Sequence, residues 1–222
     1  MSQTLHKYDP ERLCTYLQHH VAEFSGLAEI VKFSDGQSNP TYKLTDTAGR
    51  HFVLRAKPPG TLLKSAHAVD REFRVMTALA TTAVPVPQML HLSGEDSPLG
   101  AQFLVMEHLE GRVFWDPALP EQSPKFRQDA YHALVRTLAA LHDVDPQAVG
   151  LADFGKPGNY FSRQVARWTG QYRACETQTR PDMDWTIAWL ERNMVPDDGQ
   201  TAIVHGDYRL DNVMFDADTP DM

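Results

Sequence analysis

The first half of the chain combines apolar residues at helical spacing with short apolar runs typical of strands. A helix is predicted after Asp9-Pro10, because this pair suits the N-cap and first helical position and the apolar residues that follow recur every three or four positions. The same spacing predicts a second helix from about Val69 to Ala80. Strands are predicted at residues 30–33, 41–44, 51–56, 89–92 and 102–108.

The second half is predicted to be mainly helical. Helical spacing extends over residues 126–142, and shorter helices are predicted at 161–168 and 185–194. Two short apolar runs, residues 202–204 and 213–215, are predicted to be strands on either side of a polar loop.

A sheet-rich half followed by a helix-rich half predicts an α+β fold of two lobes, residues 1–107 and 108–222, with a cleft between them. The hydrophobic fraction of 42% and the charged fraction of 23% are those of an ordinary globular protein. A net charge of −8 argues against a nucleic-acid partner, because binding the phosphate backbone needs a concentrated basic face. The polar N-terminus, the lack of an apolar run of about 20 residues and two distant cysteines lead us to expect a soluble cytoplasmic protein with no membrane partner.

The sharpest local pattern is the sequence His205-Gly206-Asp207-Tyr208-Arg209-Leu210-Asp211-Asn212. An Asp followed five positions later by an Asn has the spacing of the protein-kinase catalytic loop, H-R-D-x-x-x-x-N. Phosphoryl transfer needs a carboxylate that accepts the proton of the attacking hydroxyl and an oxygen ligand for the metal on the phosphates. The alternative is a polar turn in which Asp207 accepts backbone amides and Asn212 caps it. The flanking apolar runs favour the catalytic interpretation, with His205 structural and Asp211 facing solvent.

Gly206, where a protein kinase has Arg, makes the loop resemble that of the aminoglycoside phosphotransferase and choline-kinase-like superfamily. More closely, the chain resembles the phosphotransferase module that some proteins carry fused to acyl-CoA dehydrogenase domains. The resemblance covers nearly the whole chain, and its other pieces follow in order: GQSNPTY at 36–42, VLRAKPPG at 53–60, Glu72, and VME at 105–107.

The resemblance implies a protein-kinase-like two-lobe fold with an antiparallel N-lobe sheet and a mainly helical C-lobe. It also implies ATP and Mg²⁺ as cofactors and transfer of the γ-phosphate to a hydroxyl of a small molecule. Asp207 would be the catalytic base and Asn212 a magnesium ligand. A nucleotide-binding pseudoenzyme is the alternative, and a homodimer is left open.

By the same resemblance, the polar turn at residues 34–41 would cover the phosphates, with Ser38 and Asn39 as donors. The turn contains a single glycine, so an ordinary hairpin loop is nearly as good an interpretation.

The strand that ends near Ala56 would supply the cation that binds the phosphates. Arg55 and Lys57 lie on the same face of an extended chain. The resemblance favours Arg55, because the resembled proteins commonly carry Arg at this point, with Lys57 as its rival. Glu72 would be the ion-pair partner of this cation, or otherwise a surface acid of its helix.

Residues 105–109 resemble the hinge that joins the two lobes. Backbone groups of Glu107 and Leu109 would bind the adenine edge, with Met106 as an apolar neighbour; without the resemblance, Met106 is simply a core residue. The aromatic residues of the second half are interpreted as core in preference to an acceptor pocket: Tyr160, Phe161, Trp168, Tyr172 and Trp185.

The sequence departs from the family pattern after the catalytic loop. The family continues with a hairpin and a strand carrying Ile/Leu-Asp-Trp/Phe-Glu, whose Asp is the principal metal ligand, whereas residues 216–221 read as a turn. We therefore expect a C-terminally truncated chain, with an incomplete C-lobe and little or no turnover by these 222 residues alone.

Overall fold

The computed structural model describes residues 8–33, 39–58, 68–94 and 97–222. The chain divides into two compact units, the first made of Met1–His142 with Val204–Met222 and the second of Asp143–Ile203. The lobe boundary predicted at residue 107 falls inside the first unit and stays a prediction.

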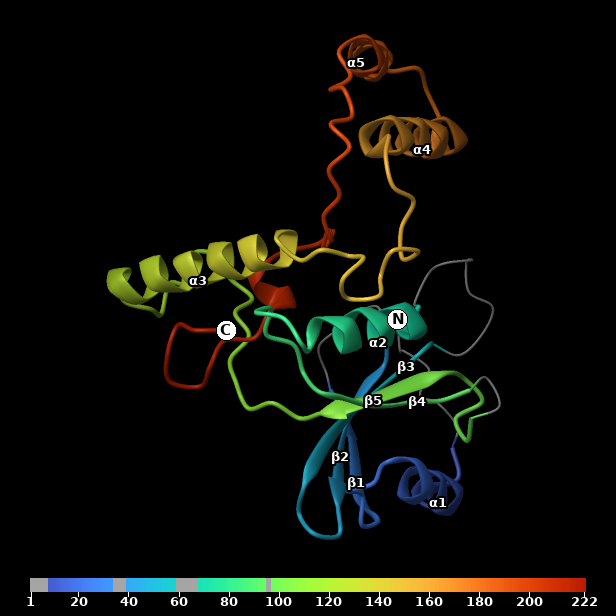
Figure 1. Ribbon diagram of the computed structural model, residues 1–222, viewed down its shortest axis with the longest axis vertical. Coiled ribbons are helices and arrows are strands. Elements are labelled where there is room, and N and C mark those ends of the chain that lie inside the picture. The colour runs from blue at the N-terminus through green and yellow to red at the C-terminus, as the bar shows by residue number, and fades with distance from the viewer. Residues whose placement is uncertain (1–7, 34–38, 59–67, 95–96) are drawn as a thin grey trace. The chain divides into compact units, whose positions relative to one another are not determined.

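The first unit contains a five-stranded sheet in the order β1-β2-β3-β5-β4, in which every neighbouring pair is antiparallel (Figure 1). The strands are β1 (Leu27–Lys32), β2 (Thr41–Asp46), β3 (His51–Ala56), β4 (Met89–Leu92) and β5 (Phe103–Glu107). All five predicted strands are therefore confirmed, as is the antiparallel arrangement. Strand β3 is central, and its backbone is fixed from both sides by β2 and β5.

The main core lies between this sheet and helix α1 (Pro10–His20). The helix begins as predicted, because the side chain of Asp9 accepts hydrogen bonds from the backbone amides of Glu11 and Arg12. Leu13 and Leu17 of α1 are fully buried. The strands contribute alternate residues to the same core, as the period of two requires.

Two further helices belong to the first unit. Helix α2 (Val69–Leu79) contacts β4 and β5. Helix α3 (Pro124–His142) begins where the hydroxyl of Ser123 accepts a hydrogen bond from the amide of Phe126, and it buries Ala130, Ala133 and Leu141. No helix within the described ranges is both long and apolar enough to cross a membrane.

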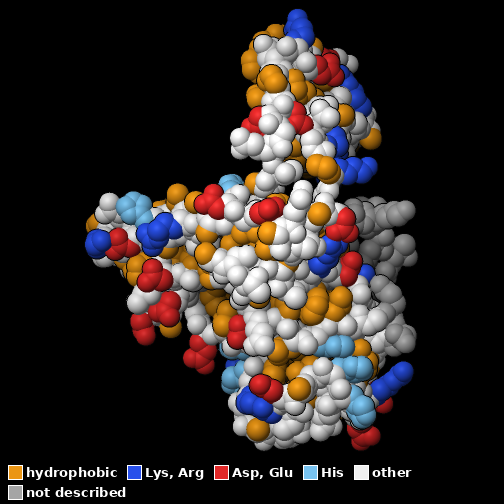
Figure 2. Space-filling view, viewed as in Figure 1, with side chains coloured by type: hydrophobic (Ala, Val, Ile, Leu, Met, Phe, Trp, Pro, Cys, Tyr) orange, Lys and Arg blue, Asp and Glu red, His pale blue; other side chains and the backbone are white. Residues whose placement is uncertain are grey.

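The second unit contains helices α4 (Tyr160–Cys175) and α5 (Pro181–Arg192), which pack on each other. Neither helix has a buried residue, and Figure 2 shows hydrophobic side chains on the unit's surface. Trp168 and Trp185 are 60% and 62% exposed, so the interpretation as core is wrong for these two residues, whereas Tyr172 is half-buried. Helical spacing located both helices correctly.

The two strands predicted around the polar loop do not form. Residues 202–204 have no regular structure, and Val204 is 56% exposed. Of the second run, only Phe215 pairs, through an isolated antiparallel bridge to Arg112. An apolar run becomes a strand only where another backbone edge offers hydrogen bonds along it. Among the described residues, the Arg112–Phe215 bridge is the one such pairing assigned to these runs.

The turn between β2 and β3 is built around a buried carboxylate. The side chain of Asp46 is 0% exposed, and it accepts hydrogen bonds from the amides of Ser25, Ala48 and Arg50. The hydroxyl of Ser25 and the guanidinium of Arg50 donate two more. Burial alone would raise the pKa of Asp46, but the hydrogen bonds from Arg50 and Ser25 outweigh it and hold this pKa at about 2.

We expect Asp46→Asn to lower the urea midpoint of unfolding at neutral pH, because the amide cannot accept the same set of donors. A depressed folded-state pKa contributes stability above the unfolded value of 3.8 and loses it as pH falls toward about 2. The midpoints of the two proteins should therefore converge on acidification through that range. Asp116→Asn is the control, since Asp116 is exposed and accepts a single amide. A gap that does not change with pH would contradict this account.

Candidate functional site

Asp207 and Asn212 are in direct contact. The amide nitrogen of Asn212 donates to the Oδ2 of Asp207 at 2.7 Å and to its backbone oxygen at 2.9 Å. A short 3₁₀ turn, Leu210–Asn212, makes the contact, because it reverses the chain within the five-residue spacing. The side chain of Asp207 is nevertheless 66% exposed. The loop therefore presents an oriented carboxylate to solvent.

Gly206 is required by the path of the backbone. Its φ is +86°, in the left-handed region where any side chain is strained, while a Cβ there would meet no atom within 4 Å. Conformation and not crowding thus explains a glycine at the position where a protein kinase has Arg.

Arg209 links the two acids of the loop, and the sequence had given it no role. Its Nε lies 3.4 Å from Oδ1 of Asp207, and its terminal nitrogen lies 2.5 Å from Oδ2 of Asp211. Asp211 was expected to face solvent, but its side chain is only 18% exposed and is paired with Arg209. A cation two residues from an acid on either side was the signal that could have revealed this arrangement.

His205 has the structural role expected of it. Its Nδ1 accepts a long hydrogen bond, 3.4 Å, from the backbone amide of Asp207, and its ring meets Tyr208 edge-on. Burial lowers the pKa of His205, and the nearby charge of Asp207 only partly offsets this. The neutral ring, which can accept this bond, is therefore favoured.

The loop is anchored on both sides. The hydroxyl of Tyr208 donates to the carbonyl of Leu134 in α3 at 2.8 Å. Leu210 and Phe215 are buried with Leu119, Ala130 and Ala133 in a second core. The exposed Asp207 side chain therefore belongs to a loop that is fixed by a buried core and by a hydrogen bond to α3.

A magnesium ion fits the donors that the loop offers. Mg²⁺ takes oxygen ligands, keeps several waters and commonly uses one or two carboxylates plus substrate phosphates. The nitrogen of the Asn212 amide is engaged by Asp207, so the amide oxygen is the atom that can bind metal. The described residues contain no group of three or more His, Cys, Asp or Glu side chains arranged to hold a metal without such help.

Arg55 and Glu72 form the expected pair. The Nε of Arg55, on central strand β3, lies 3.2 Å from Oε2 of Glu72, on α2. Their alignment is that of an ion pair and not of a hydrogen bond. The side chains are 33% and 20% exposed, so Glu72 is not a surface acid of its helix. Burial raises the pKa of Glu72, and the charge of Arg55 lowers it in part.

The other predicted phosphate ligands are less informative. Lys57 follows β3, where its amide donates to the carbonyl of Gln102 at 2.9 Å and so continues the β-ladder. Asn39 is buried, and its carbonyl accepts a hydrogen bond from the hydroxyl of Thr41. Ser38 lies outside the described residues. Their contacts with phosphate stay predictions.

The predicted hinge residues lie at the end of β5 and just beyond it. The amide of Glu107 donates to the carbonyl of Gln88 at 3.0 Å, so only its carbonyl is a candidate for binding adenine. Met106 is half-buried, and Leu109 is 44% exposed. The role of all three in nucleotide binding stays a prediction.

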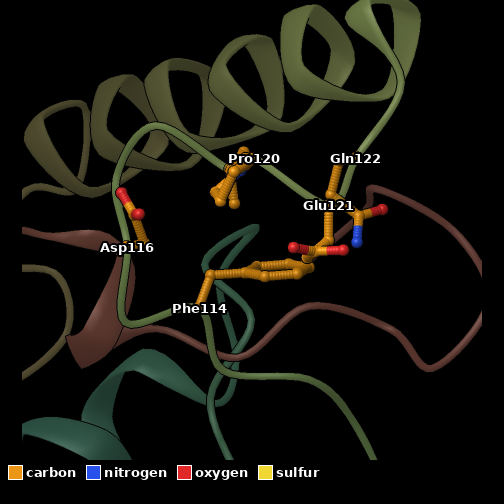
Figure 3. A pocket seen from close by; sticks show the side chains of 6 residues that line it. Phe114, Asp116, Pro120, Glu121 and Gln122 are labelled. Atoms are coloured by element: carbon orange, nitrogen blue, oxygen red, sulfur yellow. The ribbon is translucent and has the colours of Figure 1, made fainter.

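A small hollow of about 150 Å³ lies beside the second core (Figure 3). It is lined by Phe114, Asp116, Leu119, Pro120, Glu121 and Gln122, none of which was a predicted site residue. Pockets for drug-sized ligands typically measure about 300 to 1,000 Å³, so this hollow is too small for a nucleotide.

The antiparallel sheet, the ion pair between β3 and α2 and the loop with an oriented Asp and Asn define a kinase-like phosphotransferase fold. Residues 29–222 match the phosphotransferase enzyme family, and the chain belongs to that family.

Relatives confirm the resemblance to modules of acyl-CoA dehydrogenase proteins. The chain is 48% identical over 191 residues to mouse acyl-CoA dehydrogenase family member 10, a match that covers 86% of this chain and 18% of that protein. It is 42% identical over 214 residues to rat acyl-CoA dehydrogenase family member 11, covering 95% of this chain and 27% of that protein. The chain therefore spans only about a fifth to a quarter of the curated relatives it matches.

A solved structure shares the fold. A crystal structure from Ralstonia eutropha, described provisionally as an aminoglycoside phosphotransferase, is 46% identical and superposes with a TM-score of 0.85. The match covers 97% of this chain and 63% of that one.

We expect Arg55→Met to raise the pKa of Glu72 further, because the neighbouring charge that lowers it is removed while burial remains. A carbon-detected NMR titration of the glutamate carboxyls in the two proteins measures the change. Lys125→Met is the matched control, since Lys125 pairs with Asp129 and not with Glu72. An unchanged Glu72 titration in Arg55→Met would show that the pair does not interact in solution.

Proposed function

We propose that the chain is the nucleotide-binding and catalytic part of an ATP-dependent phosphotransferase that acts on a hydroxyl of a small molecule. The observation that carries the proposal is the contact between Asp207 and Asn212 in an exposed loop. A carboxylate that is fixed in orientation but open to solvent suits a base that must meet an incoming hydroxyl. Membership of the phosphotransferase family supports the same chemistry.

In this proposal, the hydroxyl oxygen of the acceptor attacks the γ-phosphorus in line with the departing ADP oxygen. Asp207 accepts the proton that this hydroxyl loses. Asn212 fixes the carboxylate through its amide nitrogen and offers its amide oxygen to Mg²⁺. The bound ion would neutralise charge on the phosphate oxygens. Arg209 keeps Asp207 and Asp211 in place through the two ion pairs.

The N-terminal sheet would bind the nucleotide. Arg55 extends from the central strand toward Glu72, and its planar guanidinium is suited to phosphate oxygens. A half-buried pair loses less freedom on binding than a flexible surface cation would. The segment at Glu107 and Leu109 would bind adenine through its backbone.

The acceptor is proposed as a class only. Two relatives are named as acyl-CoA dehydrogenase family members, so hydroxylated acyl thioesters form the first panel of acceptors to test. Aminoglycosides form the second, because of the name given to the Ralstonia structure. A pseudoenzyme that binds nucleotide without transferring phosphate is the second candidate function.

We expect Asp207→Asn to reduce kcat for phosphate transfer by about 10² to 10⁴, the usual contribution of a general base, with little change in nucleotide affinity. Coupled ADP release by the full-length gene product measures the rate, and calorimetry with ATP measures the affinity. Asp218→Asn is the control, since Asp218 is an exposed acid of the following turn. Equal rates for wild type and Asp207→Asn would favour the pseudoenzyme.

Arg55 and Lys57 can be separated by their effect on nucleotide affinity. We expect Arg55→Met to weaken ATP binding by about tenfold or more, because a hydrogen bond to a charged group contributes about 1.5 to 3 kcal/mol. Lys57→Met should weaken it less. Titration calorimetry with ATP and Mg²⁺ measures both variants, and the reverse order would assign the phosphate contact to Lys57.

A further inference from the structure

A short segment after the predicted hinge lies against the chain that follows the catalytic loop. The amide of Arg112 donates to the carbonyl of Phe215 at 2.8 Å, and the amide of Phe215 donates to the carbonyl of Arg112 at 2.9 Å. Phe215 is 1% exposed, and its ring meets that of Phe114 edge-on at 5.5 Å. The predicted hinge ends at Leu109, so two residues, Glu110 and Gly111, separate it from this bridge.

The side chain of Arg112 strengthens the contact from the same side. Its Nε donates to the carbonyl of Asp216 at 3.1 Å, and a terminal nitrogen donates to the carbonyl of Thr219 at 2.9 Å. Its guanidinium carbon also lies 4.9 Å from the centre of the Phe126 ring and 5.5 Å from that of Phe114. The Arg112 guanidinium thus donates to two backbone carbonyls and also lies against two aromatic rings.

Gly111 allows the two segments to approach each other. A Cβ at this position would lie 2.5 Å from the carbonyl oxygen of Phe215 and 2.6 Å from Cγ of Met214. Real side chains essentially never make such contacts, so one of the segments would have to move. The requirement at Gly111 is therefore for space, in contrast to the conformational requirement at Gly206.

We propose that Gly111 and Arg112 are positioning residues that couple nucleotide binding at residues 107–109 to the geometry of the loop at residues 207–212. The inference rests on the proposed function. Phe215 lies three residues after Asn212, and Tyr208 anchors the other side of the loop to α3. Without the bridge the loop keeps its contacts at Tyr208 and Leu210 but loses the backbone hydrogen bonds that fix the chain just after Asn212. A base displaced by about 1 Å can cost on the order of 10² in rate.

The test is Arg112→Met, which retains an apolar stem against the rings but removes both donors to the carbonyls. We expect kcat of the full-length gene product to fall about tenfold or more, with a much smaller change in KM for ATP. Arg112→Lys keeps a charge and a donor and should recover part of the rate. Arg167→Met is the matched control, because Arg167 also stacks on one ring, that of Trp168, but lies in the second unit.

Hydrogen exchange provides a readout that a merely structural role would not change. In the wild type, a non-hydrolysable ATP analogue with Mg²⁺ should slow amide exchange across residues 207–215. In Arg112→Met the analogue should still bind, but this added protection should be lost. Gly111→Ala should also lose this added protection, because its Cβ would collide with the carbonyl oxygen of Phe215. Gly170→Ala is its control, since a Cβ at Gly170 meets nothing within 4 Å.

The outcomes separate the coupling from the proposed function. Wild-type kcat and wild-type protection in Arg112→Met would overturn the role of the bridge, as would a wild type that gains no protection from the analogue. Protection that depends on Arg112 in a protein that transfers no phosphate would support the coupling and reject the kinase reaction. If Gly111→Ala fails to fold, the Arg112→Met and Arg112→Lys pair still decides the question.

Discussion

The antiparallel bridge between Arg112 and Phe215 joins the segment after β5 to the chain that follows the loop at residues 207–212. The second unit, Asp143–Ile203, lies between the two parts of the first unit along the chain, so the loop at residues 207–212 is far in sequence from the rest of the first unit. Arg112 and Asp216, joined by a side-chain hydrogen bond, are 104 residues apart. The entropy lost in closing so long a segment grows only slowly with its length. The entropy loss is offset at this one place by two backbone hydrogen bonds, two hydrogen bonds from the Arg112 guanidinium and the burial of the Phe215 ring.

The bridge also explains how an exposed acid can be well oriented. Asp207 is largely open to solvent, yet its neighbours Leu210 and Phe215 are buried and Tyr208 is bonded to α3. The loop therefore gains its order from neighbours that are buried or hydrogen-bonded, and not from burial of Asp207 itself. Rigid support beneath an accessible carboxylate reduces the reorganisation needed when a substrate arrives.

Much of the fold could be predicted because its signals are local. Alternating burial in β2 and the Asp9 cap of α1 depend on near neighbours in sequence, and both appear as expected. The pairing of Asp207 with Asn212 follows from a spacing of five residues and a short turn. The pairing of Arg55 with Glu72 was accessible only through the resemblance, because nothing local relates a strand to a helix that follows it.

What the sequence did not reveal depends on distant partners. The apolar run at residues 202–204 has the composition of a strand, but composition provides no hydrogen-bonding edge. Arg112 lies in an irregular segment without a helical or strand pattern of apolar residues. Only the fold shows that its side chain donates to the carbonyls of Asp216 and Thr219. The environment of Asp211 was misjudged although its partner is near in sequence, because its exposure depends on the direction of the Arg209 side chain.

The ion pairs Arg55–Glu72 and Arg209–Asp207 differ in their exposure to solvent. The pair of Arg55 and Glu72 is half-buried, and burial acts against the charge of Glu72, so the acid depends on its partner. Arg209 and Asp207 are 59% and 66% exposed, and ion pairs at such sites are weak and screened by salt. In the proposed function, the half-buried pair would hold a cation beside the phosphates of the nucleotide. The exposed pair would orient the Asp207 carboxylate and leave it accessible to an acceptor hydroxyl.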